Sequence, residues 1–371
     1  MPGPAAGTAH AATTTDVVCL GESMVTFLPS QPGRLADVPS FGRGIGGAES
    51  NVACALAAAG HRAAWVGRVG ADGFGDHLVE TIAGYGVDTS AVRRDPDRPT
   101  GIYFRTATDR GAGAHEVAYY RAGSAASAMS PSNVPYGEVF AGRILHLSGI
   151  TAALSADCLE LLRELTAPRQ GRPLVSFDVN HRPHLWRGGD ASVLLELARR
   201  ADLVFVGEDE AEEAWGIVGA EAIRAALPEP AVVVVKRGSA GATVFASGLR
   251  PGPRSSNAGG AEEGAAGTGS GDTVTVVPAL HVDVVAAVGA GDAFAAGFLS
   301  ATLRGLPVRD RVRHGHLMAA AVLTVPGDLT EPPARDHADR LAALDDGAWG
   351  RLRLGPGWTA ADRAPEEVRT S

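Results

Sequence analysis

A glycine-rich segment in the C-terminal third combines groups that suit phosphoryl transfer. It reads Val288-Gly289-Ala290-Gly291-Asp292-Ala293-Phe294 and leads into an expected helix. Glycines let the backbone approach an anion closely, and the free N–H groups at a helix N-terminus stabilise a phosphoryl group that gains charge. Asp292, in the first turn, is placed to take a proton from an attacking hydroxyl. The alternative is a plain helix start at which the dipole favours an acidic residue, and this stretch alone leaves both interpretations open.

A second glycine-rich segment lies near the N-terminus and reads Gly44-Ile45-Gly46-Gly47-Ala48-Glu49-Ser50-Asn51. Gly46 and Gly47 would let a ligand lie against the backbone, and Asn51 would hold a hydroxyl. In the alternative interpretation this is a turn in which Ser50 or Asn51 caps the following helix. Taken by itself, the segment favours the cap.

The elements that must position these residues alternate between short apolar strands and Ala/Leu-rich helices. Such βαβ alternation predicts an α/β fold with a mostly parallel central sheet between two layers of helices. We expect helices over 51–59 and 73–85, and strands over 17–20, 64–66, 144–147, 174–177, 203–206 and 231–235.

Some segments break this alternation and set the expected domain limits. Residues 25–44 and 101–124 are polar, turn-rich and strand-like, which predicts a small β-sheet lid over the C-terminal ends of the parallel strands. Residues 247–271 are rich in Gly, Ser, Ala and Pro, which indicates a flexible insertion. We expect one domain over 16–345, a disordered tail over 1–15 and a C-terminal tail over 346–371.

Composition narrows the class of partner. The 371 residues carry a net charge of -9, which disfavours nucleic acid or an acidic membrane as a partner. The three cysteines suggest neither a disulfide framework nor a metal site, and free thiols fit a cytoplasmic protein. We find neither a signal peptide nor an apolar stretch long enough to cross a membrane.

Together the two glycine-rich segments resemble the signatures of the PfkB (ribokinase-like) carbohydrate kinase family, a GG-x-x-x-N stretch and a GAGD-x-F-x-x-G stretch. Between them, Val69-Gly70-Ala71-Asp72-Gly73-Phe74-Gly75 is similar to the family's VGxDxxG loop, and Val235-Lys236-Arg237-Gly238-Ser239-Ala240-Gly241-Ala242 to its nucleotide segment. The resemblance covers roughly residues 16–345 in the expected order. It implies the ribokinase-like three-layer α/β/α sandwich with its β-lid.

Within the family, the closest resemblance is to the 2-keto-3-deoxygluconate kinases. It rests on Gly21-Glu22, Thr100-Gly101-Ile102-Tyr103-Phe104, Tyr119-Tyr120-Arg121-Ala122-Gly123-Ser124 and Asp178-Val179-Asn180-His181-Arg182-Pro183. A sugar acid carries a carboxylate, which a guanidinium binds through two parallel hydrogen bonds. Arg121 and Arg182 are therefore expected to converge on it, unless each is simply a solvated surface charge.

The resemblance implies transfer of the γ-phosphoryl group of ATP to a primary hydroxyl, with Mg²⁺ bridging the phosphates. It assigns catalysis to Asp292 as base and to the turn of Gly289, Ala290 and Gly291. The implied sugar-binding residues are Glu22, Gly46, Gly47, Asn51, Tyr103, Tyr119, Arg121 and Arg182; those near the nucleotide are Lys236, Gly238, Gly241, Gly207 and His316; and Glu210 is implied near the metal. It also implies a homo-oligomer, because an exposed lid face in this family often pairs with another subunit.

Two positions depart from the family pattern. Gly207 stands where an asparagine is common, although Glu210 keeps the acidic position, and this puts the manner of metal binding in doubt. Ala286 stands where an aspartate is common in a loop associated with a monovalent cation, which predicts weak or absent activation by K⁺. Two alternatives to a sugar-acid kinase remain: a kinase for a neutral sugar such as fructose or ribose, and a sugar-acid-binding regulatory protein that has lost catalysis.

Overall fold

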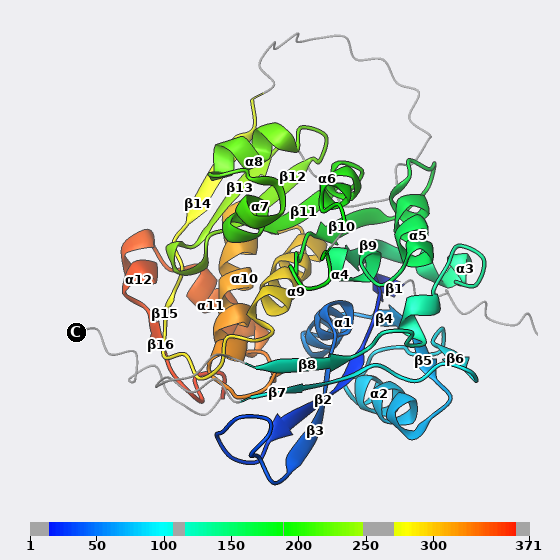
Figure 1. Ribbon diagram of the computed structural model, residues 1–371. Helices are drawn as coiled ribbons and strands as arrows, with labels where there is room; N and C mark the ends of the chain where they lie inside the picture. Colours follow the sequence, from blue (N-terminus) through cyan, green and yellow to red (C-terminus); the bar gives the residue numbers. More distant parts are fainter. Residues whose placement is uncertain (1–14, 107–115, 188, 248–270, 361–371) are drawn as a thin grey trace, which may run out of the picture.

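The computed structural model describes residues 15–106, 116–187, 189–247 and 271–360, and its main body is a large sheet between helices (Figure 1). The strands of the sheet are β1 (Thr15–Leu20), β4 (Ala63–Val66), β9 (Gly142–Ser148), β10 (Leu174–Asp178), β11 (Leu203–Gly207), β12 (Val232–Lys236), β13 (Ala242–Ala246) and β14 (Thr273–Val277). Within the described residues their order is β14-β13-β12-β11-β10-β9-β1-β4. The strands from β12 to β4 are parallel, and β13 and β14 are antiparallel. The predicted mostly parallel sheet is confirmed.

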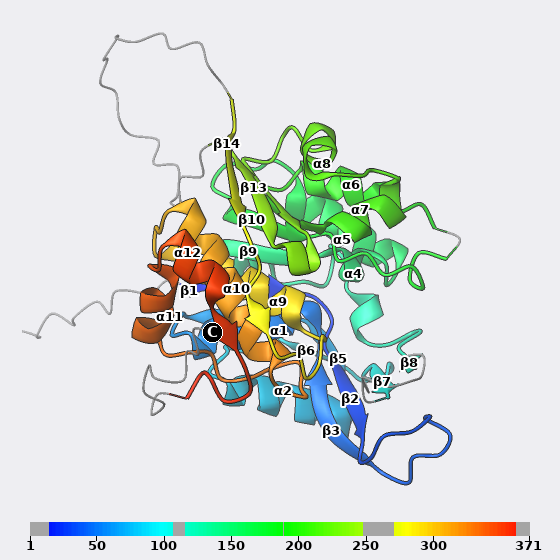
Figure 2. The same cartoon turned by 90° about the vertical axis from the view of Figure 1, so that its left-hand side faces the viewer.

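Helices cover both faces of the sheet. Neighbouring side chains of a strand point to opposite faces, so the apolar strands contribute to one core on each side. In β1, Val17 and Cys19 enter one core, and Val18 and Leu20 enter the other. Figure 2 shows the two helical layers on either side of the strands. The first core is covered by α1 (Ala48–Ala58), α2 (Gly73–Gly84), α9 (Ala290–Leu303), α10 (Val308–Leu323), α11 (Arg335–Ala342) and α12 (Asp346–Arg351). The second is covered by α3 (Tyr136–Val139), α4 (Gly149–Ala152), α5 (Ala156–Thr166), α6 (Ser192–Arg199), α7 (Glu208–Trp215) and α8 (Ala220–Ala226).

A separate sheet, here called the small sheet, projects from the main body (Figure 1). Its order is β3 (Phe41–Gly46), β2 (Met24–Pro29), β7 (Ile102–Arg105) and β8 (Val117–Tyr120), so it arises from the two segments predicted to form a β-lid. Tyr103 pairs with Tyr119 across β7 and β8. The remaining elements are β5 (Arg68–Gly70), β6 (Arg93–Asp95), β15 (His281–Val282), β16 (Arg353–Leu354) and the short helices η1 (Ala126–Ala128) and η2 (Gly238–Ala240).

Helix α1 begins at Ala48, three residues before the predicted start at Asn51. Gly47 is the N-cap residue in an extended conformation, and no side chain caps the helix. The Ser50 hydroxyl donates to the Gly47 carbonyl oxygen at 3.1 Å and to the Ser23 hydroxyl at 2.9 Å. The helix-cap interpretation of Ser50 and Asn51 is therefore wrong, and Asn51 is available for another partner.

The predicted C-terminal tail starts at residue 346, but the folded domain continues beyond that residue. Residues from 346 onward form α12, whose Trp349 is fully buried, and β16, which pairs in parallel with β15. A chain that buries Trp349, Leu352 and Leu354 gains enough from apolar burial to offset its ordering entropy. The predicted N-terminal tail and the insertion over 247–271 lie almost entirely outside the described residues. No described helix combines the length and the apolar character that crossing a bilayer requires.

Candidate active site

Asp292 lies between two adjoining cavities at the C-terminal ends of the parallel strands. An inner cavity of about 150 Å³ lies between the main body and the small sheet, and an outer cavity of about 630 Å³ opens beside it. Both are lined by Tyr119, Asn180, Arg182, Gly289 and Asp292. The inner wall adds Glu22, Gly46, Gly47, Asn51, Tyr103, Arg105, Arg121 and Asp328, and the outer wall adds Asp178, Arg187, Glu210, Lys236 and Gly291.

The two glycine-rich segments meet in one hydrogen bond. Asn51 Nδ2 donates to Asp292 Oδ2 at 2.8 Å, although 241 positions separate the two residues. Burial raises the pKa of Asp292 to about 7, and the negative charge of Asp178 acts in the same direction, whereas the Asn51 hydrogen bond lowers it. A carboxyl group with that pKa exchanges a proton near neutral pH, as a general base must.

The turn before Asp292 is built for close backbone approach. Gly289 adopts a φ of 79°, and a Cβ there would lie 2.5 Å from the Asp328 carbonyl oxygen, so only glycine fits. Helix α9 begins at Ala290, and the first N–H groups of a helix have no partner within it. A Cβ at Gly291 would lie 3.7 Å from Lys236 Nζ. Helix-terminal N–H groups and an ammonium therefore face the same space, which suits a phosphate.

Lys236 is the last residue of β12 and Asp178 is the last residue of β10, the two strands on either side of β11. Their side chains form a close ion pair. Lys236 Nζ lies 3.0 and 3.1 Å from the two Asp178 carboxylate oxygens. Burial by itself lowers the pKa of Lys236, but the carboxylates of Asp178 and Glu210 raise it above its usual value. The Glu210 carboxylate also accepts a hydrogen bond from the Gly207 N–H at 2.7 Å. The outer cavity thus holds an ammonium group, paired with Asp178, next to the Gly289–Asp292 turn.

Three guanidinium groups line the inner cavity, but they differ in how they are paired. Arg121 forms a buried ion pair with Glu22. Arg105 Nη2 lies 2.6 Å from Asp328 Oδ1, and both side chains are about 95% buried, being 4% and 5% exposed. The Arg182 side chain is 45% exposed and lies 3.5 Å from a Glu210 oxygen. Of the three, Arg182 is therefore the one whose charge is open to solvent.

Two tyrosines complete the wall that the small sheet supplies. The Tyr103 hydroxyl donates to Asp328 Oδ2 at 3.2 Å, and burial raises the pKa of Tyr103. Tyr119 stacks on His184 with ring centroids 4.8 Å apart. Both tyrosines predicted from the sequence thus line the inner cavity, and the Tyr103 hydroxyl is held by a residue that the sequence did not indicate.

A buried carboxyl group, Glu49, interacts with two carboxylates that line the inner cavity, those of Asp292 and Glu22. Glu49 is fully buried, and Thr151 Oγ1 donates to its Oε1 at 2.7 Å. Burial raises the pKa of Glu49 to about 8, and the Asp292 and Glu22 carboxylates add to the rise, while the Thr151 hydrogen bond opposes it. Glu49 is therefore largely protonated at neutral pH, which limits the negative charge around Asp292.

Four residues predicted near the nucleotide do not line the two cavities. Gly207 is the N-cap of α7, and Gly238 and Gly241 form the turn after β12 with φ of 53° and 104°. His316 packs in the core, with its ring 5.2 Å from that of Phe294, and burial lowers its pKa to about 4. His316 therefore lies in the core, and its place near the nucleotide stays a prediction. Ala286 is buried, and its effect on cation activation stays a prediction.

Sequence reasoning missed several wall residues. Arg105 follows Tyr103 by two positions in a strand, so the period of two could have placed both on the cavity face. Asp178 ends the buried strand β10 and Asn180 follows it, at the edge where α/β sheets bind ligands, and Asn180 has a φ of 43°. Asp328 lies after α10 with no pattern that marks it. Its position depends on packing between distant elements.

Comparison with known proteins agrees with this geometry. The family model described as pfkB family carbohydrate kinase matches residues 14–335. The chain belongs to the PfkB family of carbohydrate kinases. It is 34% identical over 328 residues to a 2-dehydro-3-deoxygluconokinase of Bacillus subtilis, covering 86% of this chain and 93% of that protein. A 2-dehydro-3-deoxygluconokinase of Thermoproteus tenax is 31% identical over 330 residues, covering 88% and 93%.

Among solved structures, a PfkB protein from Polaromonas sp. JS666 matches this kinase with a TM-score of 0.71 and 30% identity, covering 89% of this chain and all of that one. The resemblance predicted from the motifs is confirmed, as is the ribokinase-like fold. This PfkB kinase is therefore an ATP-dependent sugar kinase. Its two signature motifs come together at the hydrogen bond between Asn51 and Asp292.

Proposed function

We propose that this kinase phosphorylates 2-keto-3-deoxygluconate, also called 2-dehydro-3-deoxygluconate, at its primary hydroxyl. The observation that carries the proposal is the unequal pairing of the cavity guanidinium groups. Arg105 and Arg121 are held by buried carboxylates, whereas Arg182 is 45% exposed. An exposed guanidinium on the cavity wall can bind the carboxylate of a sugar acid through two hydrogen bonds. The similarity to two 2-dehydro-3-deoxygluconokinases supports the same acceptor.

In the proposed reaction, Asp292 is the base. Asn51 holds Oδ2 of its carboxylate, and Oδ1 takes the proton of the sugar hydroxyl. The hydroxyl oxygen forms a bond to the γ-phosphorus while the bond from that phosphorus to the bridging oxygen breaks, and ADP leaves with the electron pair. The N–H groups of the first turn of α9 stabilise the transferring group. Because the pKa of Asp292 is about 7, a substantial fraction is carboxylate at neutral pH.

The residues present fit a magnesium ion that is held mainly by ATP. Glu210 lines the outer cavity and offers a hard oxygen donor on the side of Lys236. Among the described residues, no group of three or more His, Cys, Asp or Glu side chains could form a metal cage. Mg²⁺ usually keeps several waters and binds through phosphates and one or two carboxylates, so one acidic residue is adequate. When bound, the ion would neutralise phosphate charge, and Glu210 would orient it.

The test is ATP consumption with 2-keto-3-deoxygluconate, its galactonate epimer, fructose and ribose as acceptors, using the native chain and two arginine variants. Arg182→Leu removes the exposed cavity guanidinium, and Arg199→Leu is the matched control, because Arg199 is similarly exposed, at 46%, and lines neither cavity. We expect Arg182→Leu to lower kcat/KM for the sugar acid by about 10- to 100-fold, the loss of one or two hydrogen bonds to a charged group. Arg199→Leu should change it by less than about 3-fold.

Three results would count against the proposal. A higher kcat/KM with fructose or ribose than with either sugar acid would make this a kinase for neutral sugars. Binding of the sugar acid without ATP consumption on any acceptor would make it a ligand-binding protein on a kinase fold. Full activity of Arg182→Leu on the sugar acid would remove the structural argument for an acidic acceptor.

A further inference from the structure

One buried carboxylate, Asp328, is held on both oxygens by the same strand of the small sheet. Arg105 Nη2 lies 2.6 Å from Asp328 Oδ1, and the Tyr103 hydroxyl donates to Oδ2 at 3.2 Å. The two donors are two residues apart in β7 and therefore share one face of the strand. The arginine and aspartate side chains are 4% and 5% exposed, so solvent screens their attraction little.

The main chain of the same aspartate touches the catalytic turn. A Cβ at Gly289 would lie 2.5 Å from the Asp328 carbonyl oxygen and 3.1 Å from its Cα, so the two backbones are in close contact. A shift of Asp328 therefore displaces Gly289, the first residue of the turn that ends at Asp292. Because the helix start is rigid, a displacement at Gly289 moves the N–H groups that follow it.

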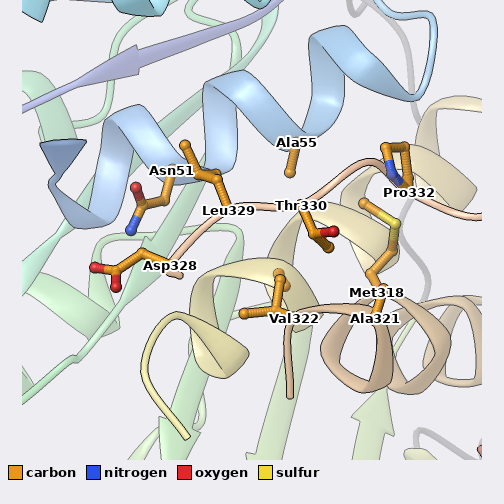
Figure 3. A pocket seen from close by; sticks show the side chains of 10 residues that line it. Asn51, Ala55, Met318, Ala321, Val322, Asp328, Leu329, Thr330 and Pro332 are labelled. Carbon is orange, nitrogen blue, oxygen red and sulfur yellow. The ribbon is translucent and has the colours of Figure 1, made fainter. Parts of the chain in front are cut away.

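The segment that carries Asp328 is itself fixed by packing. Figure 3 shows Leu329, Thr330 and Pro332 running between α1 and α10. Asn51 and Asp328 both line this small pocket of about 10 Å³, which leaves room for little more than one water molecule. With so little free volume, Asp328 cannot move independently of its neighbours.

We propose that Arg105 is a positioning residue that acts through Asp328 to couple the small sheet to the Gly289–Asp292 turn. The side chain of Asp328 is bound by the small sheet, and its main chain contacts the Gly289–Asp292 turn and fixes the position of that turn. The turn is thus in place for phosphoryl transfer only when the small sheet stands over the inner cavity. This inference rests on the proposed role of the turn, but not on the identity of the acceptor sugar.

The experiment is a double-mutant cycle with Arg105→Met, Asp328→Asn and the double variant, assayed with whichever acceptor the native chain uses best. We expect each single variant to lower kcat by about 10- to 100-fold, the effect of misplacing catalytic groups by about an ångström, with KM for ATP and sugar changed by less than about 3-fold. The double variant should be no slower than the slower single variant, because both changes break one connection. Arg105→Lys keeps the charge and should recover part of kcat.

A binding measurement separates positioning from stability alone. The affinity for ADP with aluminium fluoride and the sugar, which imitates the transferring group, should fall in Arg105→Met by the same factor as kcat, while affinity for ADP alone is unchanged. A rise in KM for the sugar at constant kcat would overturn the proposal, because Arg105 would then hold the substrate. So would multiplicative losses in the double variant, or a lowered melting temperature with kcat intact in both Arg105→Met and Arg105→Lys. An active Asp292→Asn variant would instead refute the proposed base and leave the cycle interpretable.

Discussion

At the scale of single residues, burial raises the pKa of Asp292, and two of its neighbours, Asn51 and Asp178, shift that pKa further in opposite directions. Asn51 donates to its carboxylate and lowers the pKa, and the charge of Asp178 raises it. A base works when it is deprotonated, so kcat/KM should rise with pH through an apparent pKa near 7. Asn51→Ala should move this acidic limb to higher pH by about one to two units, the equivalent of one hydrogen bond to a charged group. Asp178→Asn should move the limb to lower pH, because the negative charge that raises the pKa of Asp292 is removed and Lys236 loses its counter-charge.

The measurement is kcat/KM as a function of pH, between about pH 5 and 9, at saturating ATP. The apparent pKa of the acidic limb is read independently of the maximal value of kcat/KM. Each variant serves as the control for the other, since the two shifts have opposite signs. Shifts in the same direction would mean that another group limits the rate. An unmoved limb in both variants would mean that Asp292 is not the titrating base.

The sequence marked the candidate site residues more clearly than the residues that hold them. Asp292 and Asn51 stand in short motifs next to glycines, and local backbone demands make such motifs recognisable. Arg121 was predicted to bind the substrate carboxylate, yet it is paired with Glu22 in a buried contact. Such pairing is decided by how the chain after β8 meets the loop between β1 and β2. No local pattern encodes that contact, and for the same reason Asp328 could not be predicted.

At the scale of elements, Asp72 joins the start of α2 to the start of β7. Its Oδ1 accepts from the N–H groups of Phe74 and Gly75 and from Thr100 Oγ1, and its Oδ2 accepts from the Thr100 N–H at 2.9 Å. Asp72→Ala removes a helix cap and a tie to the strand that carries Tyr103. We expect it to lower the free energy of unfolding by about 2 to 4 kcal/mol, and to raise KM for the sugar.

The matched control for this prediction is Asp76→Ala in the same helix turn. Asp76 pairs with Arg94 at 2.9 Å, but the two side chains are 64% and 38% exposed, so we expect less than about 1 kcal/mol. Urea unfolding at neutral pH measures both variants. The hydrogen bonds lower the pKa of Asp72 in spite of its burial, so the difference between native chain and variant should persist above pH 4 and fade only in stronger acid. Equal losses in the two variants would refute the anchoring role.

Elements of the main body were predictable because they bury continuous apolar runs. Every residue of β11 is buried, and a run of that kind between turn signals is typical of a strand inside a parallel sheet. Helix starts were less predictable, as α1 shows. Its N-cap is a glycine, which has no side chain to signal a helix start. Ser50 and Asn51 resemble caps, so the predicted start lies three residues too late.

At the scale of the whole molecule, the C-terminal segment supports the part of the chain that leads into the Gly289–Asp292 turn. The strand β16 pairs with β15, and the Asp283 N–H donates to the Leu354 carbonyl oxygen at 2.9 Å, just before the loop that leads to Gly289. This support was not expected from the sequence, because the segment is short and has few apolar residues. Its Trp349 ring lies against Arg313 and His316 of α10.

Trp349 is the residue on which that support depends. It is fully buried, the Arg313 guanidinium lies 4.6 Å from its ring centroid, and its indole N–H donates to the Pro278 carbonyl oxygen at 3.0 Å. Trp349→Ala would leave a large cavity and remove a cation–π partner from a buried charge. We expect a loss of about 3 to 5 kcal/mol in the free energy of unfolding, together with a lower kcat at temperatures where the variant is folded.

The control is Trp358→Ala, because Trp358 is only half-buried and lies at the edge of the same core. Its truncation should cost less than about 2 kcal/mol and leave kcat unchanged. Urea unfolding and steady-state rates at low temperature measure both variants. If Trp349→Ala lost stability but kept the native kcat, the C-terminal segment would stabilise the fold without positioning the turn. If neither changed, the pairing of β15 with β16 would not depend on this side chain.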